Sequence, residues 1–382
     1  MRDGERSSGE AQSPRDHQAF YPGLVLDGRY RLDRPLAEGG MGTVWVGRQI
    51  ALQREVAVKL LRVGSDPLRE RLRREALALA AVHHPSVVQV FDYGETESGA
   101  PYIVMELVRG EPLGQRVLRH GPLETPAAVR LALPLLEGLA VAHRAGIVHR
   151  DIKPENVMLS TGPAGVLPKL LDFGIARVAQ GDEARLTADG GIIGTPAYMA
   201  PEQVRGHDAD ERVDVWGIGV LLYEIIAGKP PFGIDDPIAV IRRVLDEPPP
   251  FPREARSLDG RLWSILMAAM RKDPADRTST ALALRDSLVG WLESRGLSAA
   301  APVELHLAEA APGPISPSLR GAPTQAAPGS PPAPRSLREG AASPPRSPGR
   351  ADIDAMADTE PMALSADPES FEALIRAKFG QS

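Results

Sequence analysis

The chain has 382 residues, enough for two or three average domains or for one large two-lobed domain with tails. Hydrophobic residues make up 43% and charged residues 25%, which is typical of a soluble globular protein and excludes a wholly disordered, collagen-like or membrane-embedded chain. The net charge of -6 argues against partners such as nucleic acid or an anionic membrane. The absence of cysteine excludes a disulfide framework, a zinc–cysteine site and thiol catalysis.

The first part of the chain predicts a polar leader followed by a small β-rich lobe. Residues 1–22 are polar and show no periodicity, so we expect them to be disordered. They contain no apolar signal-peptide core, which predicts a cytoplasmic protein. Residues 23–112 contain short β segments broken by turns, and these predict strands at 30–36, 42–46, 55–61, 87–93 and 102–107. One helix is expected among them at 66–82, where apolar residues recur at helical spacing.

Residues 113–296 predict a larger helical lobe. Thr125 followed by Pro126 predicts an N-cap and a first helical position, opening a helix that runs to residue 144. Two short strands are expected at 157–159 and 169–171. The longest apolar stretch, 215–228, contains Glu224 and is too short to span a bilayer, so we expect a buried helix and no transmembrane segment. The fold class is therefore α+β, with a small-molecule site expected between the two lobes.

The end of the chain predicts a linker and a short helix. Fourteen of the 37 prolines lie beyond Gly296, which places a domain boundary there. Residues 297–362 are rich in Pro, Ala and Ser and are expected to form a disordered linker, because they cannot bury enough apolar surface to offset the entropy of ordering. Residues 363–382 predict a short amphipathic helix that is marginal alone. We consider two interpretations of it, a frayed terminus and a peptide that docks on a partner.

Two features of the small lobe indicate phosphate chemistry. A glycine-rich turn at residues 36–45 contains Gly39 and Gly42, which let a backbone lie against phosphate oxygens and donate N–H groups to them. Taken alone, such a turn is as typical of an ordinary hairpin as of a phosphate-binding loop. Lys59 ends an apolar β run, where a desolvated ammonium needs a partner, and Glu75 on the following helix is the candidate.

The strongest cluster is His149-Arg150-Asp151-Ile152-Lys153-Pro154-Glu155-Asn156, followed by Leu171-Asp172-Phe173-Gly174. With these motifs the chain resembles the protein kinase superfamily, and specifically bacterial serine/threonine kinases of the eukaryotic type. The resemblance covers about residues 24–295 and includes Ala200-Pro201-Glu202, the segment 214–219 and Arg277 in the same order. It implies a two-lobed protein-kinase-like fold and an ATP-dependent protein serine/threonine kinase in soluble signal transduction.

The resemblance also implies a role for each polar group of the site. Lys59 would hold the α- and β-phosphates of ATP, and Glu75 would fix its rotamer. Asn156 and Asp172 would hold Mg²⁺, or Mn²⁺ in its place, because hard cations prefer oxygen ligands.

Two further residues would act on the reacting groups. Asp151 would accept the proton of the substrate hydroxyl. Lys153 would neutralise charge on the transferring phosphoryl group. With a lysine at this position, the chain resembles the serine/threonine branch of the superfamily rather than the tyrosine branch.

The resemblance places the adenine between the lobes. The side chains expected around it are Leu36, Val44, Ala57, Met105 and Met158, and the backbone from Glu106 to Val108 would supply hydrogen bonds. Ala37 stands where the family has the first glycine of its loop. Since Gly39 and Gly42 remain, we expect altered nucleotide affinity rather than lost activity.

The segment between Asp172 and Glu202 resembles an activation loop. Thr187 is the expected site of autophosphorylation, and Arg150 is the residue expected to receive its phosphate. Asp189 stands where relatives often have a second threonine, so it is expected to supply constant negative charge. Thr195 is expected to shape the acceptor site through Asp151 and Lys153.

Three charged residues are expected to be structural. Glu202 and Arg277 would form a buried ion pair that ties the activation segment to the helical lobe. Asp214 would hold the backbone of the catalytic loop, residues 149–156.

Two other classes of function compete with a protein kinase. A pseudokinase scaffold or binding module would keep the fold without catalysis, but Lys59, Asp151, Asn156 and Asp172 are all present. A small-molecule kinase, such as one that acts on aminoglycosides, would lack the long activation segment. The expected partners are ATP and protein substrates with Ser or Thr acceptors, and dimer contacts between copies of the chain stay open.

Overall fold

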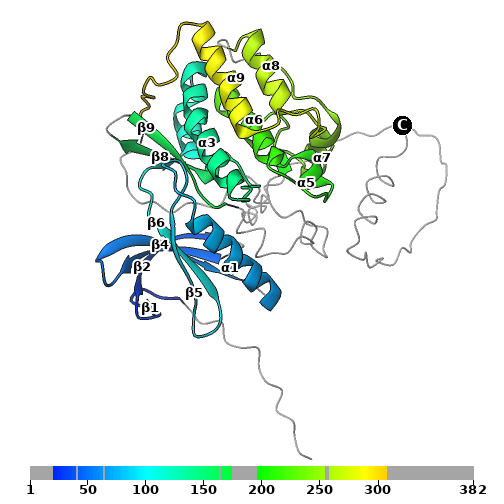
Figure 1. Ribbon diagram of the computed structural model, residues 1–382. Helices are drawn as coiled ribbons and strands as arrows, with labels where there is room; N and C mark the ends of the chain where they lie inside the picture. The colour runs from blue at the N-terminus through cyan, green and yellow to red at the C-terminus, as the bar shows by residue number, and fades with distance from the viewer. Residues whose placement is uncertain are drawn as a thin grey trace, which may run out of the picture. The chain divides into compact units, whose positions relative to one another are not determined.

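The computed structural model describes residues 20–39, 42–62, 65–162, 165–173, 196–253 and 258–307. The N-terminal leader up to residue 19, the linker from residue 308 and the expected helix at 363–382 lie outside these residues. The described part forms two lobes, a β-rich lobe followed by a helical one (Figure 1). The predicted α+β class and order of lobes are therefore confirmed.

The first lobe is an antiparallel sheet with the strand order β1-β2-β3-β4-β6-β5. Its strands are β1 (Val25–Leu26), β2 (Tyr30–Gly39), β3 (Gly42–Gln49), β4 (Arg54–Leu61), β5 (Val90–Glu95) and β6 (Pro101–Glu106). Helix α1 (Asp66–Ala80) packs against β5 and buries Leu72, Ala76 and Leu79, which lie on one stripe at helical spacing. The helix starts with Pro67 in its first turn, where a missing N–H costs nothing.

The second lobe contains a small sheet and most of the helices. Its sheet has the order β7-β8-β9, built from β7 (Glu111–Pro112), β8 (Val157–Gly162) and β9 (Gly165–Leu170). The helices are α2 (Leu113–His120), α3 (Thr125–Arg144), η1 (Pro154–Asn156), η2 (Pro196–Tyr198), α5 (Pro201–Val204), α6 (Arg212–Ala227), α7 (Pro237–Asp246), α8 (Gly260–Ala269) and α9 (Ala281–Ser294). Because β7 pairs with β8, the second lobe begins slightly before the predicted boundary at residue 113.

Helix α6 is the central element of the second lobe. Every residue from Val213 to Ile226 is buried, which agrees with the buried helix expected at 215–228. Two glycines in it allow close packing. A Cβ on Gly217 would lie 2.8 Å from Cβ of Ile152 in the catalytic loop, and one on Gly219 would lie 2.9 Å from Cγ of Met270. A larger residue at 217 would push the helix away from the loop that carries Ile152, and one at 219 would push it away from the end of α8.

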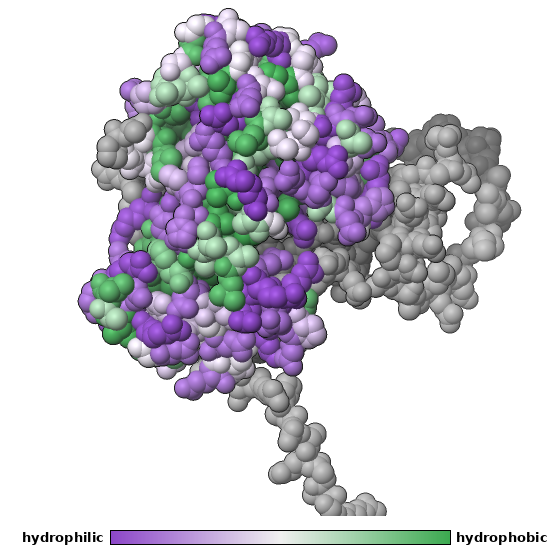
Figure 2. All heavy atoms as spheres, in the orientation of Figure 1, coloured by the Kyte–Doolittle hydropathy of each residue, from purple (hydrophilic) through white to green (hydrophobic). Residues whose placement is uncertain are grey.

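Helix α3 is apolar along most of its length. Among the described residues it is the one helix long and apolar enough to cross a membrane, and 67% of its most apolar window is buried inside the fold. Pro134 lies within it without ending it. We therefore interpret α3 as a core helix. On the outside of the molecule, hydrophilic residues cover much of the face seen in Figure 2.

Two local predictions were wrong. The strand expected at 87–93 begins at Val90 as β5, because the preceding residues pair elsewhere: Val87 forms a parallel bridge with Leu170, and Val88 N–H donates to Leu170 O at 2.9 Å. Thr125 is the first residue of α3 rather than its N-cap, which is Glu124, and Thr125 is fully buried. Tertiary contacts override local propensity at the strand, and at residue 125 the side chain is buried in the core.

The predicted boundary after Gly296 was also wrong, because residues 297–307 return along the second lobe. Val303 is buried at 7% exposure, and its carbonyl accepts a hydrogen bond from Val166 N at 3.0 Å on β9. Arg130 of α3 donates to Ser298 O at 2.9 Å. Gly165 has a φ of +98°, and a Cβ there would lie 3.0 Å from Val303 O, so the close approach requires glycine. The folded part therefore extends at least to residue 307.

A charge at position 303 tests whether this segment belongs to the folded part. We expect Val303→Asp to lower the free energy of unfolding by about 2 kcal/mol, because an unpaired carboxylate would replace a buried apolar side chain. Urea unfolding of the full chain measures it. Glu304→Gln, at the exposed neighbouring position, is the matched control. Equal stability of the two variants would show that residues 297–307 add nothing to the fold.

Candidate active site

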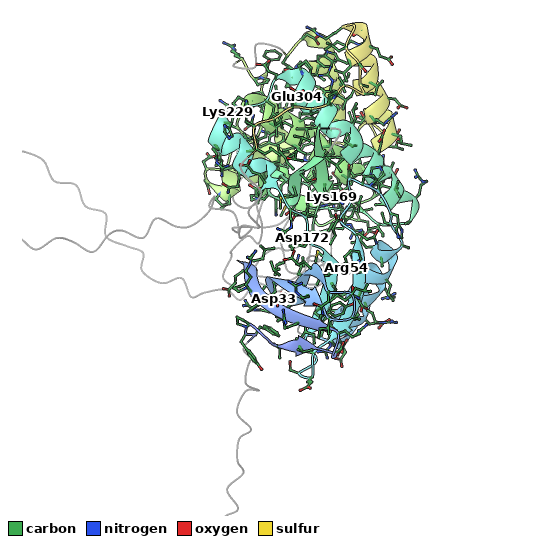
Figure 3. All side chains as sticks on the ribbon, turned by 90° about the vertical axis from the view of Figure 1, so that its left-hand side faces the viewer. Asp33, Arg54, Lys169, Asp172, Lys229 and Glu304 are labelled. Atoms are coloured by element: carbon green, nitrogen blue, oxygen red, sulfur yellow. The ribbon has the colours of Figure 1, made fainter. Side chains whose placement is uncertain are left out.

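The site begins with a contact between the two lobes. Lys59 lies on β4, buried at 6% exposure, and its Nζ donates to Oδ1 of Asp172 at 2.7 Å. Asp172 follows β9 of the second lobe, and Figure 3 shows it where the strands of one lobe approach the other. The structure thus joins the predicted phosphate-binding lysine and one of the two predicted metal ligands.

The charge state of Asp172 follows from its surroundings. Burial alone would raise its pKa, but the ammonium of Lys59 and the nearby charge of Lys153 outweigh this, and the pKa of Asp172 lies below its ordinary value. Asp172 is therefore a carboxylate at neutral pH. Its backbone has a φ of +52°, an unusual conformation for a non-glycine residue.

The structure does not bring Lys59 and Glu75 together as an ion pair. Glu75 lies on α1, and its Oε1 is 3.7 Å from Nε of Arg71 one turn earlier. Lys59 instead takes Asp172 as its partner. The predicted Lys59–Glu75 pair would therefore need a rearrangement of the side chains or of α1.

The catalytic loop brings three predicted residues together. Lys153 Nζ donates to both carboxylate oxygens of Asp151, at 3.0 and 2.8 Å. Asn156 Nδ2 donates to Oδ2 and to the backbone oxygen of Asp151, both at 2.8 Å. Burial would lower the pKa of Lys153, but the Asp151 carboxylate outweighs it and holds the pKa above its ordinary value. The loop therefore places a carboxylate, a cation and an amide within hydrogen-bond reach.

A buried carboxylate holds this loop in shape. Asp214, at the start of α6, accepts hydrogen bonds at 2.8 Å from the backbone N–H groups of His149 and Arg150 and contacts Nε2 of His143 at 2.8 Å. Arg150 has a φ of +63°. This strained conformation is maintained because Asp214 fixes the N–H groups of His149 and Arg150, while the N–H of Asp151 donates to Nδ1 of His149 at 3.3 Å.

Sequence reasoning assigned no role to His143 or to the His149 side chain. His149 is fully buried, its Nε2 lies 2.8 Å from Leu171 O, and its ring packs against Phe173 at a centroid distance of 4.5 Å. It links the catalytic loop to the segment that carries Asp172. The position of His149 at the start of the catalytic motif was the available signal, whereas nothing in the sequence connected His143 to Asp214.

Glu202 and Arg277 form the expected pair with two parallel contacts. Arg277 Nη1 donates to Oε1 at 2.7 Å and Nη2 to Oε2 at 3.0 Å, and both residues are buried. Arg277 also donates to the carbonyls of Arg271 and Arg212. The pair therefore ties α5 to the start of α6 and to the loop after α8.

The glycine-rich turn joins β2 to β3. Gly42 has a φ of +144°, and a Cβ there would overlap the carbonyl oxygen of Leu60, so glycine is required. Gly39 pairs with Gly42 across the hairpin. Ala37 pairs with Val44 within the strands, and it is not among the described non-glycine residues with positive φ. Its methyl group is therefore compatible with the strand.

The residues expected around adenine lie at the junction of the lobes. Ala57, Met105 and Met158 belong to one buried apolar cluster, against which Val44 and Val108 pack. Ala57 and Met105 are direct partners across β4 and β6. Leu36 on β2 is also buried. Thr187, Asp189, Thr195 and Gly174 lie outside the described residues.

The oxygen donors fit a magnesium ion held mainly by nucleotide phosphates. In the described part of the chain, no three or more His, Cys, Asp or Glu side chains form a metal-binding group. Asp172 and Asn156 supply two oxygen donors, and the hydrogen bonds of Asn156 use its amide nitrogen. Mg²⁺ is commonly bound through one or two carboxylates together with substrate phosphates and water, so this small donor set suits it.

The family follows from comparison with known proteins. The protein kinase domain matches residues 30–289, and the chain belongs to this family. It is 43% identical over 276 residues to the serine/threonine-protein kinase pkn2 of Myxococcus xanthus, covering 69% of the chain and 32% of the relative. It is 41% identical over 271 residues to the serine/threonine-protein kinase PknB of Mycobacterium leprae, covering 69% and 43%.

A third relative, the probable serine/threonine-protein kinase PknB of Corynebacterium glutamicum, is 39% identical over 301 residues, covering 75% of the chain and 45% of the relative. The chain thus spans about a third to a half of the length of these relatives. The resemblance to bacterial serine/threonine kinases is confirmed. Proteins of this family bind ATP, typically with a divalent metal ion.

The Glu202–Arg277 pair gives a stability prediction. We expect Arg277→Ala to lower the free energy of unfolding by about 3–5 kcal/mol, because it leaves the buried Glu202 carboxylate unpaired. Urea unfolding measures this. The control is Arg285→Ala, which breaks a half-exposed pair with Glu137 and should cost less than about 1 kcal/mol. Equal losses in the two variants would contradict the structural role of the buried pair.

Proposed function

We propose that the chain is a protein serine/threonine kinase that transfers the γ-phosphoryl group of ATP to hydroxyl groups of protein substrates. The observation that carries the proposal is the contact at 2.7 Å between Lys59 of one lobe and Asp172 of the other, beside the Asp151–Lys153–Asn156 cluster. The charge of Lys153 acts on Asp172, so the two groups share one electrostatic site. The names of the relatives support serine and threonine as acceptors.

The chemistry assigned to the residues is phosphoryl transfer. The oxygen of the substrate hydroxyl forms a bond to the γ-phosphorus of ATP, and Asp151 accepts the hydroxyl proton. The bond between the γ-phosphorus and the β–γ bridging oxygen breaks, which releases ADP. Lys153 balances the charge on the transferring group. Lys59 exchanges Asp172 for the α- and β-phosphates, with Glu75 as its second partner. Asp172 and Asn156 would hold Mg²⁺, or Mn²⁺ in its place, which neutralises phosphate charge when bound.

A pseudokinase scaffold is the other candidate. The assembled hydrogen bonds between Asp151, Lys153 and Asn156 favour catalysis, because a scaffold has no need of a positioned carboxylate. We place the protein in the cytoplasm in soluble signal transduction. Pairing of two copies, and docking of the 363–382 segment on a partner, are further parts of this proposal.

Regulation by Thr187 belongs to the same proposal. Arg150 Nε is buried and has no hydrogen-bond partner among the described residues, so its guanidinium is suited to receive a phosphate. Thr187 is the acceptor, and Asp189 supplies negative charge before phosphorylation. Thr195 shapes the acceptor site through Asp151 and Lys153.

The catalytic proposal is tested with Asp151→Asn. We expect phosphoryl transfer from labelled ATP to a generic basic protein to fall by about 10²–10⁴-fold, because the amide cannot accept the proton. Asp286→Asn, at an exposed carboxylate on α9, is the control and should transfer at the normal rate. Undetectable transfer by the unaltered protein with either Mg²⁺ or Mn²⁺ would support the scaffold instead.

The regulatory proposal is tested by mass spectrometry of protein incubated with ATP. Phosphate should be found on Thr187, and Thr187→Ala should lower the transfer rate by about tenfold, equivalent to one charge-assisted hydrogen bond. Abundant phosphate elsewhere in 174–195 with Thr187 unmodified would contradict the assignment.

A further inference from the structure

A second ion pair joins the two lobes. Lys169 lies on β9 and Glu106 is the last residue of β6. Lys169 Nζ donates to both carboxylate oxygens of Glu106, at 2.9 and 2.7 Å. Lys169 is 9% exposed, and Figure 3 shows it near Asp172 at the junction of the lobes.

Both members of this pair adjoin residues expected to bind adenine. Glu106 itself begins the 106–108 backbone segment assigned to adenine hydrogen bonds. Lys169 is the direct cross-strand partner of Met158 in the β8–β9 hairpin, and Met158 is the residue expected on the other side of the ring. The ion pair between Lys169 and Glu106 therefore links the backbone expected to bind adenine with the strand pair that carries Met158.

Further hydrogen bonds fix the Glu106 end of the pair. Glu106 N–H donates to Gln89 O at 2.9 Å, and Gln89 N–H approaches Oε2 of Glu106 at 3.4 Å. The side-chain amide of Gln89 donates through Nε2 to Ala80 O at the end of α1 and to Val90 O on β5. These contacts connect the carboxylate with the end of α1, the helix that carries Glu75.

The Lys169 end is fixed by the position of β9. Leu170 N–H donates to Ser86 O at 2.8 Å, and Leu170 O accepts from Val88 N–H at 2.9 Å. On the other side, Val166 N–H donates to Val303 O. Backbone hydrogen bonds therefore fix β9 on both sides, and with it the position of the Lys169 backbone.

Stability alone does not account for a lysine at this place. Removing an ammonium from water is costly, and replacing a buried ion pair by apolar side chains of similar volume is often neutral or stabilising. What two contacts to one carboxylate add is a defined direction and distance between the strands that carry them. That property matters where the two lobes must present opposite sides of one ligand.

We propose that Lys169 and Glu106 are a positioning pair that sets the distance between the adenine-binding backbone 106–108 and Met158, and thereby the affinity for the nucleotide. The inference rests on the proposed function, because that function assigns these residues to the adenine. Among the described residues, neither member of the pair forms a hydrogen bond with Asp151, Lys153 or Asn156, so the pair acts on binding and leaves the transfer step alone.

The proposal predicts a separation of binding from turnover. Without the ammonium of Lys169, the Glu106 carboxylate loses its partner and segment 106–108 can shift relative to Met158. Because the lost contact is a charge-assisted one, we expect its removal to weaken ATP binding by about tenfold. The Kd for ATP and the KM for ATP should both rise by this factor, whereas kcat and the KM for the protein substrate should stay within about threefold.

The test uses the full chain with Lys169→Met, Glu106→Gln, the double variant and Lys169→Arg. Calorimetry with Mg²⁺ and ATP gives Kd, steady-state kinetics gives KM and kcat, and thermal melting reports stability. Lys169→Arg should restore most of the affinity lost in Lys169→Met, because arginine can also donate two bonds to a carboxylate. The double variant should lose no more than the worse single variant, since both remove the same interaction. Arg285→Met, at the surface pair with Glu137, is the matched control.

Three results would overturn the proposal. One is an unchanged Kd for ATP in Lys169→Met with a lower melting temperature, which would make the pair purely structural. Another is a loss confined to kcat, and the third is additive losses in the double variant. Because Kd needs no phosphoryl transfer, an unaltered protein that binds ATP without transferring it would defeat the proposed function and still allow this comparison. An unaltered protein that binds no ATP would defeat both.

Discussion

The attraction between a buried ammonium and a carboxylate on the opposite lobe is the interaction on which the site depends. Lys59 is surrounded by apolar strands, where an unpaired charge would be strongly unfavourable. Asp172 supplies the opposite charge from the second lobe at 2.7 Å. In the proposed function, the ammonium binds phosphates and the carboxylate binds a metal ion. The pair would then hold both groups in place until ligands of opposite charge replace it.

The remaining polar groups of the site are held by the helical lobe. The Asp214 carboxylate fixes the backbone of His149 and Arg150, and Gly217 brings α6 close to Ile152. The loop can therefore carry Asp151 and Asn156 in a fixed arrangement. Orientation of this kind, made before a ligand arrives, is the main contribution that a protein makes to phosphoryl transfer.

The proposed catalytic set could be selected from the sequence because the chemistry restricts the residue types and their order. Lys59, Asp151, Asn156 and Asp172 carry distinct motifs, and the folded chain brings them to one region. The partner of Lys59 could not be predicted in the same way, because a motif specifies residues and leaves the conformation of α1 open. Glu75 therefore lies beside Arg71 while Asp172 takes the lysine.

Other features depend on contacts that local patterns do not record. Lys169 looks like an exposed strand residue, and only the pairing of the lobes places it against Glu106. The composition change at residue 297 marked the start of a proline-rich region, but Val303 and its apolar neighbours are few enough to be hidden in it. Both omissions concern β9, which receives the ion pair in one place and the returning chain in another.

The most direct test of the account is a crystal structure of the full chain with Mg²⁺ and a non-hydrolysable ATP analogue. The account predicts that Lys59 Nζ leaves Asp172 for the phosphates, and that Asp172 and Asn156 bind the metal ion while Asp151 faces the γ-phosphate. A nucleotide bound elsewhere, or one bound with these four side chains directed away from it, would contradict the account.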